Sequence, residues 1–195
     1  MTSAPPDPWL EPWLPALVRH AGGGAVLEIG CGHGEDTATL LAAGLPVLAF
    51  DRSEDAVAAA RRRAPSARIE CRDLRDPLPA APASLGAVVA SLSLHYFGWA
   101  ETVATVQRLR DVLKPGGLLL GRLNADDDVH FGARGHPQIE PRFFLVDGEP
   151  KRFFDEDDVR RLFASGWTLQ SLRRGVTHKY GPPKSLLELA CERLD

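Results

Sequence analysis

Three glycines at alternate positions, Gly30, Gly32 and Gly34, directly follow the apolar run 26–29. Glycine is needed where the backbone must approach a ligand closely or adopt a positive φ, because a side chain would prevent both. A second apolar run, 47–50, ends in Asp51. An acidic residue at the tip of a second strand is placed to accept hydrogen bonds from ribose hydroxyls. Together these residues predict a site for a cofactor that contains a nucleoside.

The spacing of the glycines indicates which kind of nucleoside cofactor binds. A dinucleotide site has its third glycine three positions after the second, so that a helix N-terminus receives the pyrophosphate. Here the glycines are two apart, Glu35 and Asp36 open the next helix, and Glu28 precedes the loop. These carboxylates would repel a pyrophosphate. They suit S-adenosylmethionine, which has a sulfonium and an ammonium group and no phosphate.

Alternating strands and helices are predicted to position these residues. Five alternations indicate a mainly parallel sheet with right-handed crossovers. Two strands at the end of the chain and a helix that Asp155 caps complete the pattern, and a hairpin is expected across Asp147-Gly148. The predicted strands are 25–29, 47–50, 67–71, 86–92, 118–123, 167–175 and 185–191, and the predicted helices are 35–43, 53–63, 100–113 and 156–164.

Composition favours a cytoplasmic enzyme. With 195 residues, 44% of them hydrophobic and 25% charged, the chain has the composition of one globular domain. The net charge of -3 gives no electrostatic reason to expect a nucleic acid. The three cysteines show neither a disulfide framework nor zinc spacing, which favours a reducing compartment. No apolar stretch reaches the length of a membrane span. Neither a nucleic acid nor a membrane is therefore expected as a partner.

Four motifs resemble those of the class I S-adenosylmethionine-dependent methyltransferases. The segment 28–34 resembles the first motif of that family, and Asp51 its ribose-binding acidic residue. Asp73, followed by Leu74, resembles the acidic residue that meets the adenine amino group. The segment 113–117 resembles the turn before the fifth strand. The resemblance implies a Rossmann-like α/β fold, with a seven-stranded sheet, helices on both faces and an antiparallel last strand.

A closer resemblance concerns the segments 9–14 and 91–97. They are most similar to small bacterial methyltransferases related to the tellurite-resistance and thiopurine methyltransferase group. This similarity implies methyl transfer to a small molecule. The stretch Ser91-Leu92-Ser93-Leu94 lacks the residues typical of enzymes that methylate nucleobase amines, which favours a sulfur, oxygen or simple amine acceptor.

Site residues follow from the rule that ligands of open α/β sheets lie at the carboxyl ends of the strands. His95 and Tyr96 follow the fourth strand and are expected to face the methyl group as catalytic residues. The alternative is that His95 caps the strand and Tyr96 packs in the core. The residues expected to bind the cofactor are Glu28, Gly30, Cys31, Gly32, Gly34, Asp51, Arg52, Asp73, Leu74, Ser91 and Leu92.

Two segments outside these motifs are expected to reach the acceptor. Residues 1–24 are predicted as an N-terminal helical cap, and 25–195 as a single domain in which 124–151 is a substrate-side lid, since long loops often form such lids. A structural elaboration with surface charges is the alternative. The acceptor residues expected from the two segments are Trp9, Trp13, His130 and Arg134.

The sequence leaves room for three other interpretations. A protein that binds the cofactor without turnover would have the same cofactor-binding motifs. A nicotinamide oxidoreductase would also use Asp51, although the glycine spacing and Asp73 oppose it. A magnesium site at 126–128 is disfavoured, because consecutive carboxylates cannot all point to one ion, and no metal is expected.

Overall fold

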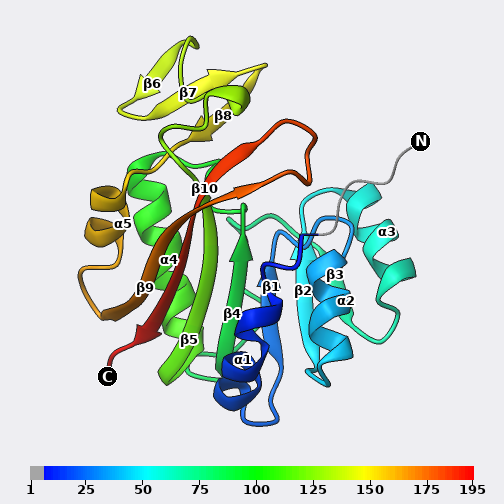
Figure 1. Cartoon of the computed structure of the whole chain (residues 1–195). Coiled ribbons are helices and arrows are strands. Elements are labelled where there is room, and N and C mark those ends of the chain that lie inside the picture. Colours follow the sequence, from blue (N-terminus) through cyan, green and yellow to red (C-terminus); the bar gives the residue numbers. More distant parts are fainter. Residues whose placement is uncertain (1–6) are drawn as a thin grey trace.

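A seven-stranded sheet runs through the centre of the computed structural model, which describes residues 7–195 (Figure 1). The first six residues of the predicted cap therefore lie outside the described part of the chain. In chain order the strands of this sheet are β1 (Val26–Ile29), β2 (Val47–Asp51), β3 (Arg68–Cys71), β4 (Leu85–Ser91), β5 (Leu113–Asn124), β9 (Trp167–Thr177) and β10 (Lys184–Arg193).

The strand order is β3-β2-β1-β4-β5-β10-β9. Strands β1 to β5 are parallel to one another, whereas β10 is antiparallel to both β5 and β9. The predicted Rossmann-like fold with an antiparallel last strand is thus confirmed. The order reverses between β1 and β4, and in open α/β sheets the crevice at such a reversal is where ligands bind.

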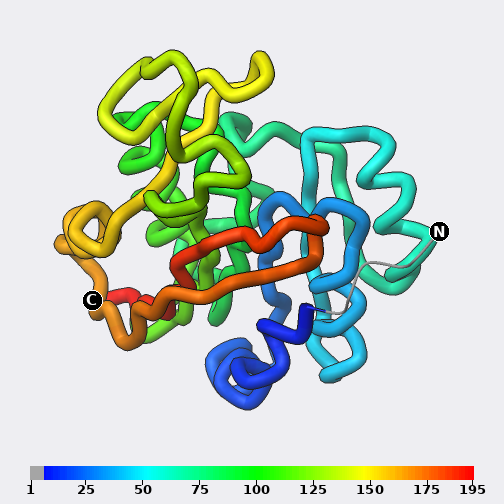
Figure 2. Tube along the Cα trace, turned by 45° about the horizontal axis from the view of Figure 1, so that its top comes forward, coloured from blue at the N-terminus to red at the C-terminus, as the bar shows by residue number. Residues whose placement is uncertain are grey.

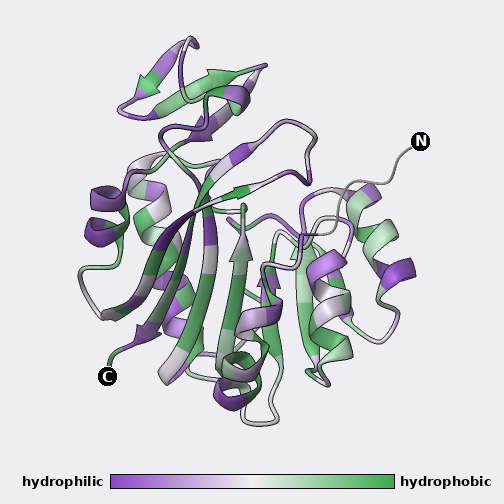
Figure 3. Ribbon diagram, viewed as in Figure 1, coloured by the Kyte–Doolittle hydropathy of each residue, from purple (hydrophilic) through white to green (hydrophobic). Residues whose placement is uncertain are grey.

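Helices cover both faces of the sheet, as predicted. Buried side chains of α1, α2 and α3 pack in one apolar cluster, and those of α4 and α5 pack in another on the opposite face. Figure 3 shows the apolar residues concentrated on the central strands between these layers. No helix among residues 7–195 is both long and apolar enough to cross a membrane. The helices are α1 (Leu14–Ala21), α2 (Glu35–Ala42), α3 (Glu54–Arg63), α4 (Trp99–Val112) and α5 (Glu156–Leu162), with short 3-10 turns η1 (Glu11–Trp13) and η2 (Val129–Phe131).

Local chemistry sets the ends of several elements. The Ser53 hydroxyl accepts a hydrogen bond from the Ala56 N–H at 3.2 Å, and Asp155 accepts one from the Asp158 N–H at 2.7 Å, so α3 and α5 have side-chain N-caps. Strand β5 begins earlier than predicted. Leu113 already pairs with Leu85, and the expected turn at 114–117 becomes an irregularity within the strand.

The segment expected to be irregular contains a second, three-stranded sheet: β6 (Gln138–Glu140), β7 (Phe143–Val146) and β8 (Glu149–Arg152). The predicted hairpin is confirmed, because β7 and β8 pair across Asp147 and Gly148, both at positive φ. Strand β6 was missed, since three residues are too few to show a period of two. Figures 1 and 2 show this small sheet above the carboxyl ends of the central strands.

Helix α1 packs closely on the central sheet. It contacts β4 and β5, and the His20 ring lies 2.9 Å from the Gly116 carbonyl oxygen. The approach to β4 is possible because residue 86 is glycine: a Cβ there would lie 1.9 Å from the His20 carbonyl oxygen.

We expect Gly86→Ala to destabilise the protein by about 1–3 kcal/mol, since the added methyl group must push α1 off the sheet. Gly121→Ala is the matched control on β5, because a Cβ there meets Leu189 only at an ordinary 3.4 Å. Denaturant unfolding of the two variants measures the difference. Equal stabilities would contradict the close packing of α1.

Candidate active site

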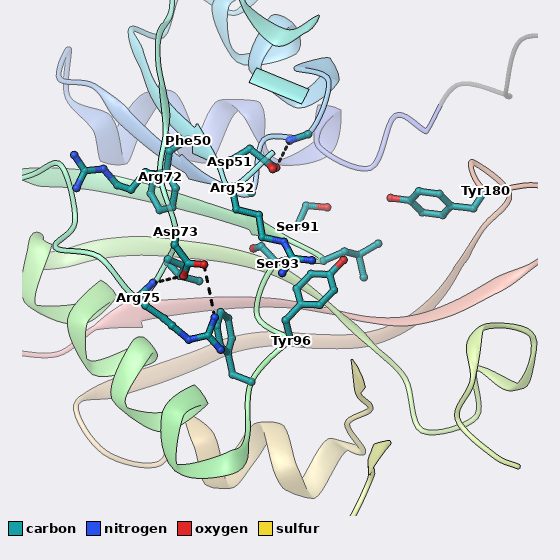
Figure 4. Close-up of a pocket in the computed structure, with 15 residues that line it drawn as sticks. Phe50, Asp51, Arg52, Arg72, Asp73, Arg75, Ser91, Ser93, Tyr96 and Tyr180 are labelled. Atoms are coloured by element: carbon teal, nitrogen blue, oxygen red, sulfur yellow. Dashed lines mark hydrogen bonds and ion pairs between the residues drawn. The ribbon is translucent and has the colours of Figure 1, made fainter. Parts of the chain in front are cut away.

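A cavity of about 240 Å³ opens at the carboxyl ends of β1, β2 and β4 (Figure 4). It lies where the strand order reverses. Eight of the eleven residues expected to bind the cofactor line it, and so does the catalytic candidate Tyr96. The eight are Gly30, Gly32, Asp51, Arg52, Asp73, Leu74, Ser91 and Leu92.

The three glycines of the first loop have positive φ values of 67°, 52° and 81°. They serve different purposes. A Cβ at Gly30 would lie 2.6 Å from the Ser93 Cβ, and one at Gly34 would lie 3.0 Å from Ala60 of α3. A Cβ at Gly32 would meet no protein atom within 4 Å, although this residue lines the cavity. Gly30 and Gly34 therefore permit packing, whereas Gly32 keeps space open for a ligand.

Asp51 is held rigidly at the end of β2. Its Oδ2 accepts a hydrogen bond from the Gly32 N–H at 2.9 Å, and its Oδ1 accepts one from the Ser53 N–H at 3.0 Å. A carboxylate offers about four acceptor sites, so both oxygens can still accept hydroxyl protons. The next residue, Arg52, pairs with Glu149 of β8 at 3.3 Å and lies over the Tyr96 ring.

Asp73 and Leu74 lie in a turn after β3 that is fixed from two sides. The Arg75 N–H donates to Asp73 Oδ1 at 2.8 Å. Arg108 of α4 donates to the Leu74 carbonyl oxygen at 2.8 Å. This turn therefore presents an acceptor and an apolar side chain together at the cavity, which suits the edge and face of an adenine.

Glu28, Cys31 and Gly34 do not line the cavity. Glu28 lies in β1 beneath the loop, 3% exposed, and accepts a hydrogen bond from the Thr37 hydroxyl at 2.6 Å. Burial raises its pKa to about 8, against the lowering effect of Thr37. Burial likewise raises the pKa of the Cys31 thiol, so this cysteine is an inert packing residue.

Other lining residues were not singled out as cofactor ligands from the sequence. Phe50 and Arg72 directly precede predicted site residues, so their position next to a strand end was a usable signal. Tyr180 comes from the loop between β9 and β10, which reaches back over the first strands (Figure 2). Lys179 of the same loop pairs with Glu35 of α2 at 3.3 Å. Only the tertiary structure reveals this contribution.

A second cavity, of about 180 Å³, adjoins the first. The two share Leu92, Tyr96 and Tyr180 in their walls. Leu92 has a φ of 52°, a strained conformation for a residue with a side chain, and such strain is concentrated at functional sites. The remaining lining residues of the second cavity are His95, Asn124, Phe131, Lys151 and Lys184.

Arg152 of β8 fixes the segment that carries His95. Its backbone N–H donates to the His95 carbonyl oxygen at 2.7 Å, and its Nε donates to that of Phe97 at 3.0 Å. The Arg152 guanidinium, only 3% exposed, also pairs with Glu140 of β6. The small sheet is thereby joined to the end of β4.

His95 and Tyr96 both carry neutral side chains at neutral pH. The His95 ring is buried, and its Nδ1 has no hydrogen-bond partner in the described part of the chain. Burial, together with the positive charges of Lys184, Lys151 and Arg52, lowers its pKa to about 3. Burial raises the pKa of the Tyr96 phenol. Neither group is suited to take a proton from an acceptor.

The four residues expected to reach the acceptor lie outside the walls of both cavities. Trp9 is buried, donates its indole N–H to the Asp36 carboxylate at 2.9 Å, and stacks against the Arg122 guanidinium. Trp13 is half-buried on the same side of the sheet. The remaining two, His130 and Arg134, are exposed.

The acidic run 126–128 forms ion pairs with cations of the last two strands. Asp126 and Asp127 pair with Arg174 at 2.9 and 3.1 Å. Asp128 is buried and pairs with Lys184 at 2.8 Å. No group of three or more His, Cys, Asp or Glu side chains within residues 7–195 is arranged to hold a metal ion.

We expect the buried Glu28 to make the stability of the cofactor-free protein fall with rising pH. Its pKa rises from 4.5 to about 8 on folding, so unfolding releases the proton between these values. Glu28→Gln keeps the hydrogen bond from Thr37 but cannot ionise. Its free energy of unfolding relative to wild type should therefore rise by about 1.4 kcal/mol per pH unit between the two pKa values.

Glu11→Gln is the control for this effect, because Glu11 is exposed on η1. Thermal unfolding at pH 5, 6.5 and 8 measures all three proteins. A difference between Glu28→Gln and wild type that stays constant over this range would show that Glu28 is ionised throughout.

Comparisons with known proteins agree with this geometry. The Methyltransferase domain family model matches residues 26–117. Trans-aconitate 2-methyltransferase of Rhizobium meliloti (strain 1021) is 34% identical over 122 residues, which are 60% of this chain and 46% of that protein. The enzyme of the same name from Delftia acidovorans is 35% identical over 107 residues, 53% and 37% of the two chains. The chain spans less than half the length of these relatives.

Solved structures share the fold. A SAM-dependent methyltransferase of Methanosarcina mazei superimposes with a TM-score of 0.75 at 19% identity, covering 87% of this chain and 92% of that one. The 1,6-didemethyltoxoflavin-N1-methyltransferase of Burkholderia thailandensis, with bound 1,6-didemethyltoxoflavin and S-adenosylhomocysteine, gives 0.72 at 20% identity, covering 95% and 78%. Residues 26–117 thus match a methyltransferase domain, and the fold is that of solved SAM-dependent methyltransferases.

Proposed function

We propose that the protein transfers a methyl group from S-adenosylmethionine to a small-molecule acceptor by in-line displacement. The observation that carries the proposal is the pair of adjoining cavities. The first has the glycine loop and Asp51 in its wall, and the second meets it at Leu92 and Tyr96. In such an arrangement one ligand can present a methyl group directly to another, and much of the rate enhancement comes from this positioning.

The residues present fit this cofactor. Both Asp51 oxygens can accept ribose hydroxyl protons, and Asp73 can accept from an adenine amino group while Leu74 contacts the ring. The loop at Gly32 leaves room for the methionine part beside Ser91. When bound, the cofactor supplies an electrophilic methyl group on a positively charged sulfur. The chain itself supplies orientation and the exclusion of water.

The second cavity supports a small acceptor. Its volume of about 180 Å³ is on the scale of a small metabolite. A trans-aconitate methyltransferase similar in sequence and a 1,6-didemethyltoxoflavin methyltransferase similar in fold act on molecules of this kind. Residues 124–151 contribute Asn124, Phe131 and Lys151 to the wall, which supports their assignment as a substrate-side lid. A cytoplasmic location and a closer relationship to the thiopurine methyltransferase group stay predictions.

We assign His95 and Tyr96 to orienting the acceptor rather than to proton transfer. Both line the acceptor cavity, and their rings lie 4.1 Å apart between centroids. Arg152 fixes the His95 backbone, so the two rings form a stable wall against which an acceptor can lie.

We expect Asp51→Ala to weaken the binding of S-adenosylhomocysteine by about 1–3 kcal/mol, because a pair of ribose hydroxyls loses its acceptor. Asp55→Ala is the matched control, since Asp55 is exposed in the first turn of α3. Isothermal titration calorimetry measures both affinities. An Asp51→Ala affinity equal to that of wild type would remove Asp51 from the cofactor site.

Titrations together with an assay of methyl transfer distinguish the other two functions. Binding of NADH without binding of S-adenosylhomocysteine would support an oxidoreductase. Tight cofactor binding, with no methyl transfer to thiols, phenols, amines or carboxylic acids, would support a cofactor-binding protein without turnover.

A further inference from the structure

The second cavity is positively charged. Two lysines, Lys151 of β8 and Lys184 of β10, lie in its wall, and no Asp or Glu is among its lining residues. The chain as a whole carries a net charge of -3, so this concentration of cations does not reflect the composition. The Arg52 guanidinium, in the wall of the adjoining cavity, adds to the positive potential that lowers the pKa of His95.

Only one of the two lysines has its charge balanced. Lys184 pairs with the buried Asp128 at 2.8 Å, and its Nζ lies 4.4 Å from the centre of the Phe131 ring. Lys151 makes no ion pair with any acidic group of residues 7–195. It is half-buried at the cavity, where an unbalanced charge attracts an anion more strongly than it would in bulk water.

The wall also contains polar atoms that lack partners. His95 Nδ1 and Asn124 Oδ1 are both buried, and neither forms a hydrogen bond within the described part of the chain. Buried polar atoms are normally paired, so these two orphans make this part of the wall polar. Asn124 is itself fixed, because its Nδ2 donates to the Arg152 carbonyl oxygen at 3.3 Å.

Neither His95 nor Tyr96 in this wall is suited to act as a general base. Burial lowers the pKa of His95 to about 3 and raises the pKa of Tyr96, while Lys184, whose pKa burial also lowers, is paired with Asp128. A hydroxyl, thiol or ammonium acceptor would have to lose a proton during transfer. A carboxylic acid, with an ordinary pKa near 4, arrives already deprotonated.

We propose, building on the function proposed above, that the methyl acceptor is a small di- or tricarboxylic acid. One carboxylate would be anchored by Lys151 beside Lys184, and a second would react at Leu92 and Tyr96. Two carboxylates are needed because a carboxylate oxygen paired with an ammonium group is a weakened nucleophile. Only a carboxylate away from the lysines keeps its full reactivity.

The transfer step is balanced without a base. A lone pair of the free carboxylate oxygen forms a bond to the methyl carbon as the carbon–sulfur bond breaks, and the bonding electrons remain on sulfur. The sulfonium becomes a neutral thioether, the carboxylate becomes a neutral methyl ester, and no proton moves. The unsuitability of His95 and Tyr96 as bases is therefore consistent with this acceptor.

The test is binding of polycarboxylates to the protein saturated with S-adenosylhomocysteine, measured by calorimetry. The probes are tricarballylate and trans-aconitate, with their neutral trimethyl esters as controls. The acids should bind and the esters should not. Lys151→Met should weaken binding of the acids by about tenfold or more, the loss of one charge-assisted contact. Lys114→Met, at an exposed lysine near the start of β5, should bind them like wild type.

The outcomes separate this inference from the proposed function. If S-adenosylhomocysteine binds but the acids do not, or if Lys151→Met binds them like wild type, the polycarboxylate site is wrong and the cofactor site stands. If S-adenosylhomocysteine itself does not bind, both the proposed function and the polycarboxylate acceptor are wrong. With methyl-labelled cofactor, the product should release methanol in mild alkali, as an ester does. A base-stable product on a thiol or amine would overturn the carboxylate as nucleophile.

Discussion

The close approach of β1 and β4 at their carboxyl ends is the constraint on which the site depends. The chain enters the first loop against Ser93, at a distance that admits no side chain on Gly30. The sheet order reverses between these two strands: β1 leads to α2 on one face and β4 to α4 on the other, which leaves a crevice between their ends. The loop from β1 and the strained turn at Leu92 after β4 therefore form two sides of one cleft, and the Gly32 N–H fixes the Asp51 carboxylate at its edge.

The small sheet β6–β8 contributes to the wall of the second cavity and fixes the segment after β4. Arg152 binds the backbone of the segment after β4, and β8 places Lys151 one residue away from it. The loop between β9 and β10 approaches from the opposite direction, tied to α2 by Lys179 and to Phe131 by the Tyr180 ring. The second cavity is thus bordered by three segments that are distant in sequence. Its shape depends on contacts between them rather than on any one loop.

The walls of the two cavities differ in their acidic residues. The cofactor side has Asp51 and Asp73 together with three arginines, whereas the acceptor side has two lysines and no acidic residue. An anionic acceptor would meet a complementary charge at the lysines, and methyl transfer to it from a cationic donor neutralises both charges. Because opposite charges in a partly buried site attract strongly, the arrangement also favours the two ligands lying together.

The sequence alone determined the order of the elements, the parallel sheet, the N-caps at Ser53 and Asp155, and most of the cofactor site. Those features depend on neighbouring residues: glycines after a strand, or an acidic residue at a strand tip. Tertiary structure decided the acceptor cavity, where it placed Lys151, Lys184 and Tyr180 and left Trp9 and His130 outside. Side chains from separate segments meet there only after the small sheet and the last hairpin have packed, and no local pattern of residues encodes that meeting.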